Sequence, residues 1–554
     1  MTDKAVEVPV LIAGAGPVGL ALAGDLGWRR VPSLLVEKRS GRIAQPKMDM
    51  VGVRTMEFCR RWGIVDWVES AGYNRAYPQD CAWMTSLNGY EFGREPFPAP
   101  QDEALPPQSP QKRERCPQNY FDPVLTRFAR RSGLAEIRYH TELVSFEDAG
   151  DKVVAHLRST VTGEVTTVEA QYLVGCDGSD SLVRTSLGIE MSGKGVLSYT
   201  TNVIFRYDGL ERLHHLSPAY RYIFIGPEGT WATLVAINGR DEWRFSLIGD
   251  STQKEPTEAD IHAAIVRAVG REFDFEILSI LPWVRRQLVA DRYRDGRVFI
   301  AGDAAHLASP TGGFGMNTGV LDAVNLSWKL AAVVQGWGDQ TLLDSYEIEQ
   351  RPVAIRNVNE AGGNLDRMLS PHIATPDPLI FSGDGADAER ARREYGEHYT
   401  ETMKREWFSI GIHLGYVYEG SPIVVPDGTA APEITVSTYM QTARPGSRAP
   451  HVWLGERYSI LDEYGSEFVL VSFAGAAGTD GFVAAADEVG VPLRVLEVDH
   501  AEAAALYAAA YVLVRPDGSV AWRADRLPED PRTVLRVACG ARSDSDVAPA
   551  GVVA

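Results

Sequence analysis

The sequence is poor in the residues that bind structural metals or form disulfide frameworks. Its 554 residues include five cysteines, which are scattered without a CxxC pair, and eleven histidines without an HExxH motif. Dispersed thiols are typical of a reducing compartment rather than of a disulfide scaffold or a zinc site. We therefore predict no metal site in this protein.

Long apolar runs are absent as well. No run is long enough to cross a bilayer, and the first residues lack a basic region followed by an apolar stretch and a cleavage site. The formal net charge is −19, which argues against nucleic acid and against an anionic membrane surface as partners. We expect a cytoplasmic protein with no nucleic-acid partner and no membrane partner.

The first positive signal is a glycine-rich loop between two apolar β-runs near the N-terminus. Residues 8–13 form the first run, residues 20–26 have a helical pattern, and residues 33–36 form the second run. Strand, glycine turn, helix, strand and acid are the fingerprint of a dinucleotide-binding βαβ unit. The predicted dinucleotide contacts are Gly14, Gly16, Gly19 and Glu37.

Each of these four residues has a separate task in such a unit. Gly14 makes the turn, Gly16 admits the pyrophosphate, and Gly19 lets helix and strand pack closely. Glu37 would bind a hydroxyl of the adenosine ribose. The Lys-Arg pair that follows Glu37 would suit a 2′-phosphate, so NADP is the alternative ligand at this loop.

A second strand–loop–helix corner lies at residues 296–319, which read GRVFIAGDAAHLASPTGGFGMNTG. Asp303 follows a short β-run and can accept a hydrogen bond from a ligand hydroxyl. The glycines after it let backbone N–H groups approach a flat ligand, and a helical pattern begins at Asn317. The backbone at Gly315, Met316 and Asn317 would present the positive end of that helix to the ligand.

A third apolar β-run, at residues 172–179, also ends in an acid beside a glycine. It reads YLVGCDGS and places Asp177 before Gly178, much as the second corner places Asp303 after Gly302. An ordinary turn residue is the alternative for Asp177. The recurrence of an acid beside a glycine at a strand end favours a ligand that the two corners share.

With these three stretches together, the chain resembles the class A flavoprotein monooxygenases, in particular the phenol-hydroxylase-like aromatic hydroxylases. The resemblance identifies residues 14–19 as the FAD loop. It implies that the motif around Asp177 serves both FAD and NAD(P)H, and that Asp303 meets the ribityl chain of the flavin. Further matches to positions of the family are Arg54 and Gln118, expected as FAD contacts, and Tyr346 and the Arg351-Pro-Val-Ala354 stretch.

The resemblance also implies the architecture, an α/β fold with a Rossmann-like FAD-binding domain at 1–190 and 286–360. A substrate-binding domain at 191–285 and 361–420 is interleaved with it. Alternating apolar residues at 199–249 independently predict antiparallel strands with one covered face. Residues 446–554 are similar to a thioredoxin-like C-terminal domain without its CxxC, which implies packing or association, including a homo-oligomer.

The implied activity is that of an FAD-dependent monooxygenase that uses NAD(P)H and O₂ to hydroxylate a phenolic or polycyclic aromatic substrate. The backbone at 315–317 is suited to stabilise the negative charge of reduced flavin. Asp49 stands five residues before Arg54, where phenol hydroxylases have an Asp near the substrate hydroxyl. We predict that Asp49 takes the phenol proton, the alternative being a solvated loop carboxylate.

Two other functions compete with this one. A Baeyer–Villiger-type flavin oxygenase, or another FAD oxidoreductase, could be built on the same fold. A flavin-binding protein without catalytic activity, in which the C-terminal region mediates assembly, is the third possibility.

Overall fold

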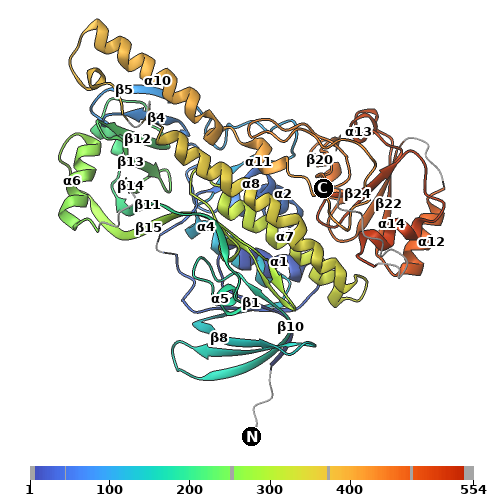
Figure 1. Ribbon diagram of the computed structural model, residues 1–554. Coiled ribbons are helices and arrows are strands. Elements are labelled where there is room, and N and C mark those ends of the chain that lie inside the picture. The colour runs from blue at the N-terminus through green and yellow to red at the C-terminus, as the bar shows by residue number, and fades with distance from the viewer. Residues whose placement is uncertain are drawn as a thin grey trace, which may run out of the picture.

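The computed structural model describes residues 6–43, 45–249, 255–370, 373, 375–473 and 478–541 (Figure 1). The last part of the expected C-terminal domain, 542–554, lies outside the described residues. The described residues form two eight-stranded sheets and a separate four-stranded sheet near the C-terminus. The predicted α/β fold is confirmed. No helix in the described ranges is both long and apolar enough to cross a membrane.

The first sheet carries the glycine loop and the two acidic strand ends. Its main strand order is β16-β17-β10-β1-β2-β7, with the β8–β9 hairpin joined to β10, and its central strands are parallel. The apolar runs predicted from the sequence are its buried strands. The bounds are β1 Val6–Ala13, β2 Ser33–Glu37, β7 Ala135–Tyr139, β8 Thr141–Asp148, β9 Val153–Ser159, β10 Val165–Gly175, β16 Arg294–Asp295 and β17 Val298–Ile300.

Three long helices pack together beside this sheet: α1 (Pro17–Trp28), α4 (Gln118–Arg131) and α7 (Phe314–Val334). α1 contacts both of the others. The contact between α1 and α4 requires a glycine, because a Cβ at Gly24 would lie 2.4 Å from the Phe128 ring. α7 begins three residues before the start expected at Asn317, since Gly313 adopts a left-handed conformation (φ 68°) that starts the helix.

The second sheet is almost wholly antiparallel, in the order β18-β15-β11-β14-β13-β12-β4-β5. Helix α6 (Glu258–Val269) packs on an apolar cluster of this sheet. The antiparallel strands predicted at 199–249 are confirmed, but the strand at Gly229–Ala236 is buried along its whole length rather than on one face. The bounds are β4 Cys81–Met84, β5 Glu91–Glu95, β11 Met191–Arg206, β12 Arg221–Gly226, β13 Gly229–Ala236, β14 Glu242–Ile248, β15 Glu276–Ala290 and β18 His306–Leu307.

One part of the expected domain division needs correction. β4 and β5 fall within 1–190, the range assigned to the FAD-binding domain, yet they extend the second sheet. β4 lies parallel to β12, which follows it by more than a hundred residues. Such a pairing leaves no local pattern in the sequence, so the boundary could not be drawn from residues alone.

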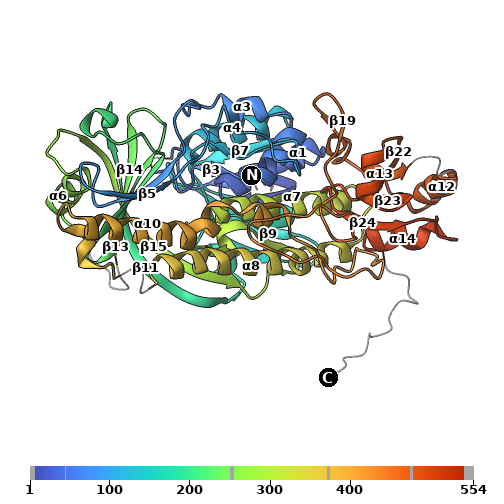
Figure 2. The ribbon, with the colours of Figure 1, turned by 90° about the horizontal axis from the view of Figure 1, so that it is seen from above.

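Helices α7 and α8 (Ser345–Met368) run side by side from the second sheet to the C-terminal domain, and α10 (Ala386–Trp407) extends along the outer strand β5 (Figures 1 and 2). Pro352 and Pro123 are accommodated inside α8 and α4. The remaining short elements are α2 Val53–Arg61, α3 Val65–Glu69, α5 Leu182–Ser186, α11 Ile410–Leu414, β3 Met50–Val51, β6 Glu114–Arg115, β19 Trp453–Gly455, β20 Tyr458–Ser459, and the 3₁₀ turns Leu210–Leu213, Gly302–Ala304, Gln340–Asp344, Pro378–Phe381 and Ile460–Glu463.

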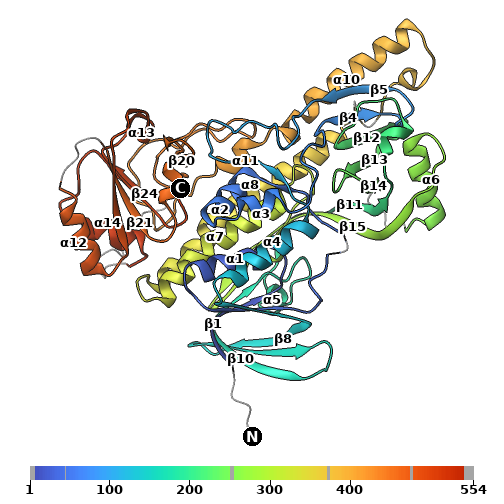
Figure 3. The same ribbon diagram turned by 180° about the vertical axis from the view of Figure 1, so that it is seen from behind.

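The C-terminal α/β domain is a four-stranded sheet of order β22-β21-β23-β24 with three helices (Figure 3). The apolar runs at 468–473 and 511–514 are its central strands. The bounds are β21 Phe468–Phe473, β22 Leu493–Val498, β23 Tyr511–Val514, β24 Val520–Ala524, α12 Asp480–Val489, α13 Ala501–Tyr507 and α14 Pro531–Ala538.

A buried ion cluster joins this domain to α7 and α8. The Glu349 carboxylate on α8 accepts two hydrogen bonds from Arg515 (2.6 and 2.9 Å) and one from Lys329 (2.7 Å), and all three side chains are buried. Asp517 binds the same guanidinium. The two cations balance the two anions, so the cluster is neutral as a whole. The arginine and lysine hold the pKa of Glu349 far below its usual range against the opposing effect of burial.

We predict that Glu349→Gln destabilises the protein by about 3–5 kcal/mol, because it leaves a buried positive charge uncompensated. Denaturant unfolding should show the loss. The matched control is Glu136→Gln, which breaks an exposed ion pair with Arg138 and should cost less than about 1 kcal/mol. Equal losses in the free energy of unfolding for the two substitutions would contradict a large contribution of the buried cluster to stability.

Candidate functional site

A cavity of about 1100 Å³ lies between the two large sheets. It brings together segments that are distant in the sequence: the glycine loop, the loop before α2, the corner at 301–316 and the strands of the second sheet. Representative lining residues are Gly16, Asp49, Gln118, Arg244, Asp303 and Met316. The cavity therefore connects the predicted dinucleotide site with the face of the second sheet that α6 does not cover.

The glycine loop is shaped by two close approaches and one open position. A Cβ at Gly14 (φ 105°) would lie 2.3 Å from the Cys176 carbonyl oxygen, and a Cβ at Gly19 would lie 2.0 Å from the Gly14 carbonyl oxygen. A Cβ at Gly16 would meet nothing within 4 Å, although Gly16 lines the cavity. The structure thus leaves room at Gly16, where the pyrophosphate of FAD is expected.

Glu37 lies at the end of β2 and is tied to the glycine loop. One carboxylate oxygen accepts a hydrogen bond from the Ala15 N–H (3.0 Å), and the other accepts one from the Arg39 N–H (2.9 Å). Each oxygen can still accept another hydrogen bond. The geometry is compatible with the predicted contact to a ribose hydroxyl, and it adds a role in closing the loop.

The second corner also presents polar groups to the cavity. Asp303 lies in the short 3₁₀ turn after β17 and lines the cavity, and its carboxylate has no hydrogen bond to the part of the chain that the structure describes. Gly315 and Met316 form the first turn of α7, which has no side-chain cap at its N-terminus. Their backbone N–H groups remain available to a ligand with negative charge.

Asn317 is brought to the corner but faces protein rather than the cavity. Its amide oxygen accepts hydrogen bonds from the Gly52 N–H (2.8 Å) and the Thr55 hydroxyl (2.7 Å), and its amide nitrogen donates to the Met50 carbonyl (3.2 Å). Asn317 therefore fixes the start of α2 against the start of α7. Because its side-chain amide is occupied by these bonds, the predicted contact with FAD would have to come from its backbone.

Gln118 lines the cavity at the start of α4. Its amide oxygen accepts a hydrogen bond from the Lys47 N–H (3.1 Å), and its amide nitrogen donates to Asp122 (3.1 Å). The side chain thus holds the loop that carries Asp49. A direct contact with FAD remains a prediction for this residue.

Asp177 caps a helix. Its carboxylate accepts hydrogen bonds from the Ser181 hydroxyl and from the Val183 N–H (3.1 Å) at the start of α5. Its neighbours Cys176 and Gly178 line the cavity. The acid therefore shapes this edge of the site by capping α5, and its contact with FAD or NAD(P)H remains a prediction.

Arg54 needs the clearest correction. Its guanidinium donates to the Tyr416 hydroxyl (2.9 Å), to Glu57 (2.7 Å) and to the Asp517 carbonyl (3.0 Å), which places it against the C-terminal domain. Glu57 also binds Arg448 of that domain. The first turn of α2 points Arg54 away from the cavity, a direction that sequence proximity to Asp49 could not reveal.

Asp49 lies in the cavity as predicted, but two arginines bind its carboxylate. Arg115 donates to one oxygen (3.2 Å) and Arg244 to the other (3.0 Å), and the Tyr220 hydroxyl is a third partner. Although burial alone would raise the pKa of Asp49, the two guanidinium groups hold it below the usual value. A carboxylate in this setting is a weak base, so the geometry favours a positioning role over proton removal.

Sequence reasoning missed the partners of Asp49. Arg244 lies on β14, Tyr220 just before β12, and Arg115 in β6. The guanidinium of Arg115 stacks 3.7 Å from the centre of the Tyr220 ring. The alternation at 199–249 could have indicated that some polar residues share one face of the sheet. It could not show that this face meets the loop at Asp49.

A buried pair supports the corner at Asp303. Nε2 of His306 lies 2.8 Å from a carboxylate oxygen of Asp322, and the same oxygen accepts a hydrogen bond from the Gly302 N–H (3.0 Å). Both side chains are fully buried. Burial lowers the pKa of His306, but Asp322 outweighs this effect and raises it. The pair fixes the turn that presents Asp303.

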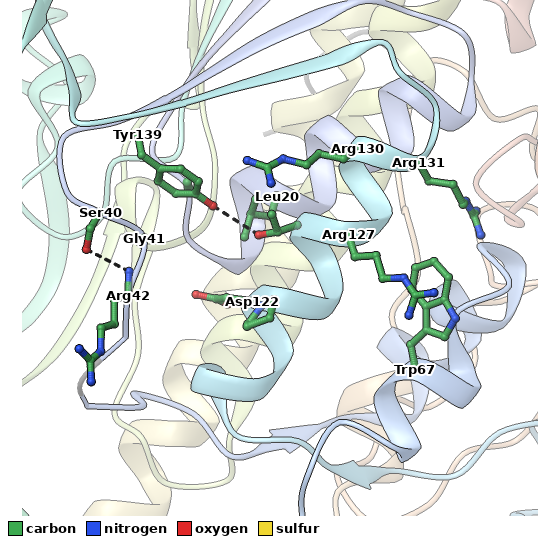
Figure 4. A pocket seen from close by; sticks show the side chains of 13 residues that line it. Leu20, Ser40, Gly41, Arg42, Trp67, Asp122, Arg127, Arg130, Arg131 and Tyr139 are labelled. Carbon is green, nitrogen blue, oxygen red and sulfur yellow. Dashed lines mark hydrogen bonds between the residues drawn. The ribbon is translucent and has the colours of Figure 1, made fainter.

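A second cavity, of about 870 Å³, lies on the other side of the glycine loop, between α1, α4 and the segment after β2 (Figure 4). Its lining includes Ala15 and four arginines, Arg42, Arg127, Arg130 and Arg131. Asp122 also lines it, with a buried Oδ1 that has no partner among the described residues. Burial raises the pKa of Asp122 to about 7. The arginines suit the phosphates or the adenosine end of a dinucleotide.

Comparisons with known proteins agree with this geometry. The model of an FAD binding domain matches residues 7–361, and that of an aromatic-ring hydroxylase C-terminal region matches residues 442–541. A 4-methyl-5-nitrocatechol 5-monooxygenase from a Burkholderia species is 33% identical, over 96% of this chain and 97% of its own.

Two solved structures resemble the whole chain. RebC with bound 7-carboxy-K252c, from crystals soaked with chromopyrrolic acid, superposes with a TM-score of 0.90 at 37% identity, over 97% of this chain and all of that one. An aklavinone-11 hydroxylase in complex with FAD and aklavinone has a TM-score of 0.81 at 31% identity, over 97% of this chain and 99% of that one.

We predict that Gly16→Val abolishes tight FAD binding without unfolding the protein. Its backbone (φ −76°, ψ 178°) is open to any residue and its side-chain space is empty, so valine would fill the room left for the pyrophosphate. Gly14→Ala should instead impair folding, because its Cβ would overlap the Cys176 carbonyl. Circular dichroism and the flavin content of the purified variants test both outcomes. Full FAD content in Gly16→Val would refute the assignment.

We predict that Asp303→Ala weakens FAD binding about ten- to a hundredfold, the loss expected for one hydrogen bond to a charged group. FAD fluorescence on dilution measures the dissociation constant. The control is Asp295→Ala, an exposed acid paired with Arg292, which should leave the constant unchanged. An unaltered constant in Asp303→Ala would remove this residue from the cofactor site.

Proposed function

We propose that this chain, which belongs to the family of FAD-binding aromatic-ring hydroxylases, hydroxylates a fused-ring phenolic compound with NAD(P)H and O₂. Its activity as an FAD-dependent monooxygenase is that of the family. The observation that carries the proposal is the continuous cavity. It joins the Asp303 corner and the start of α7 to the polar face of the second sheet.

The residues at the cofactor end fit FAD. Gly16 leaves space for the pyrophosphate, and the free carboxylate of Asp303 would bind the ribityl hydroxyls. The N–H groups of Gly315 and Met316, in the uncapped first turn of α7, would bind the flavin. When bound, FAD supplies the activation of O₂, and the protein supplies position and electrostatics. The positive end of α7 would favour negative charge on a cofactor bound there.

The substrate end is lined by aromatic and polar side chains together. Phe97, Trp283, Trp407 and Phe408 line the cavity and can contact the faces of a flat ring system. Such walls also exclude water from the reaction site. A fused-ring compound matches this lining, and the ligands named in the two solved relatives support that choice.

We propose that Asp49 does not remove the phenol proton, in contrast to the expectation from the sequence. The positively charged guanidinium groups of Arg115 and Arg244 can stabilise a phenolate that has lost its proton to water. Asp49 then keeps the two guanidinium groups and the Tyr220 hydroxyl in place. In this proposal the arginines lower the free energy of the phenolate relative to the neutral phenol, and Asp49 is a positioning residue.

The nicotinamide cofactor is part of the proposal. The arginines of the second cavity, and Lys38 and Arg39 after β2, offer positive charge beside the glycine loop. Steady-state rates with NADH and NADPH in parallel decide which of the two the protein uses.

The test of the function is aromatic-stimulated oxidation of NAD(P)H under ¹⁸O₂, followed by mass spectrometry of the product. We expect one ¹⁸O atom in a new ring hydroxyl. Insertion of ¹⁸O into an ester or lactone would identify a Baeyer–Villiger-type reaction instead. Absence of turnover with a broad panel of phenols, with FAD bound, would favour a flavin-binding protein without this activity.

We predict that Asp49→Asn lowers the yield of hydroxylated product at least tenfold, because Arg115 and Arg244 lose their common anchor. FAD binding and flavin reduction should persist. The pH profile between about 6 and 8 should keep its shape, since a carboxylate with a lowered pKa is ionised throughout this range. Product and H₂O₂ yields across pH provide the measurement. Loss of a limb of the profile in this range would restore Asp49 as the base.

A further inference from the structure

Arg285, on β15, carries an unpaired positive charge inside the cavity wall. The residue is 6% exposed and lines the cavity, and its Nε and Nη1 atoms have no hydrogen-bond partner among the described residues. A buried guanidinium without partners is costly. Such an arrangement is typical of a group that completes its hydrogen bonds with a ligand.

The neighbouring charges do not neutralise Arg285. Arg221 is bound to Oε1 of Glu406 (2.7 Å) and Arg244 to Asp49 (3.0 Å), so neither acid is bound to Arg285, although Oε2 of Glu406 is buried without a hydrogen-bond partner among the described residues. Burial and these two arginines lower the pKa of Arg285 to about 10, with Glu406 opposing them. Arg285 is therefore still protonated at neutral pH.

The strand beside Arg285 offers further donors. Ser198 is its direct partner across the β11–β15 pair, and Thr200 is the next residue of β11 on that face. Both hydroxyls are buried and have no hydrogen-bond partner among the described residues, and Thr200 lines the cavity. A guanidinium fork and adjacent hydroxyls match the planar oxygens of a carboxylate.

We infer that Arg285 and Thr200 form an anion subsite and that the substrate of this protein is a fused-ring aromatic carboxylate. The inference rests on the proposed function and narrows its substrate class. The carboxylate would lie against β11 and β15, and the ring would extend between the aromatic walls toward the cofactor end. Arg285 then sets the orientation of the ring that is hydroxylated.

The nicotinamide dinucleotide is the other possible source of an anion. Its phosphates suit the arginines of the second cavity, beside the glycine loop, whereas Arg285 lies on the opposite sheet among the substrate-facing side chains. The position of Arg285 therefore favours the substrate.

The experiment compares acids with their amides on the FAD-loaded protein. The probes are anthraquinone-2-carboxylate and 3-hydroxy-2-naphthoate, each beside its carboxamide, titrated through the absorption spectrum of the bound flavin and through the thermal midpoint. We expect the acids to bind about ten- to a hundredfold more tightly than the amides. Arg285→Gln should bring the two classes within about threefold, and Arg285→Lys should restore part of the preference.

Arg206→Gln is the matched control, because Arg206 lies on β11 of the same sheet and pairs with Glu242 and Glu276 at the surface. It removes the same charge and should keep the preference for acids. FAD content and thermal midpoints report whether each variant is folded.

Equal binding of acids and amides, or failure of both acids to bind, would overturn the anion subsite. A rise in the KM for NAD(P)H in Arg285→Gln, with the acid preference intact, would also overturn it and assign Arg285 to the dinucleotide. Acid-selective binding without incorporation of ¹⁸O into any ring would preserve the subsite and refute the proposed function. The two failures are therefore distinguishable.

Discussion

The buried carboxylate of Glu349 is the interaction on which the arrangement of the domains depends most. It accepts hydrogen bonds from Asn325 and Lys329 on α7, from Ser421, and from Arg515 of the C-terminal domain. A buried charge is tolerable only with such partners. One acid thereby fixes α7, α8 and the C-terminal domain relative to one another.

The position of α7 links this cluster to the site. Its C-terminal half carries Trp328 and Lys329 into the interface with the C-terminal domain, and its first turn presents Gly315 and Met316 to the cavity. At the same end, Asn317 joins α7 to the start of α2, and the His306–Asp322 pair supports the Asp303 turn. The C-terminal domain thus helps to hold a helix whose first turn lines the larger cavity, although none of its own residues lines the two cavities described.

The net charge of the chain does not reveal which charges line the cavity. The chain has a net charge of −19, yet the lining of the larger cavity includes Arg115, Arg221, Arg244 and Arg285 beside Asp49 and Glu406. An acidic surface and a basic interior cavity can coexist, because burial strengthens the local interactions while solvent and salt screen the distant ones. This positive charge is the basis of our proposal that the site binds phenolates and carboxylates.

The sequence by itself determined the α/β fold, the glycine loop between β1 and α1, and the corner at Asp303. These features depend on contiguous residues, since strand runs, glycine turns and helix starts are local in the chain. The tertiary structure decided what Asp49, Arg54, Asp177 and Arg285 do, because their partners come from segments far away in the sequence. Two arginines bind Asp49, Arg54 donates a hydrogen bond to the C-terminal domain, and Asp177 caps α5. The chemistry of an ionisable side chain follows from its partners and its burial, and both are properties of the folded chain.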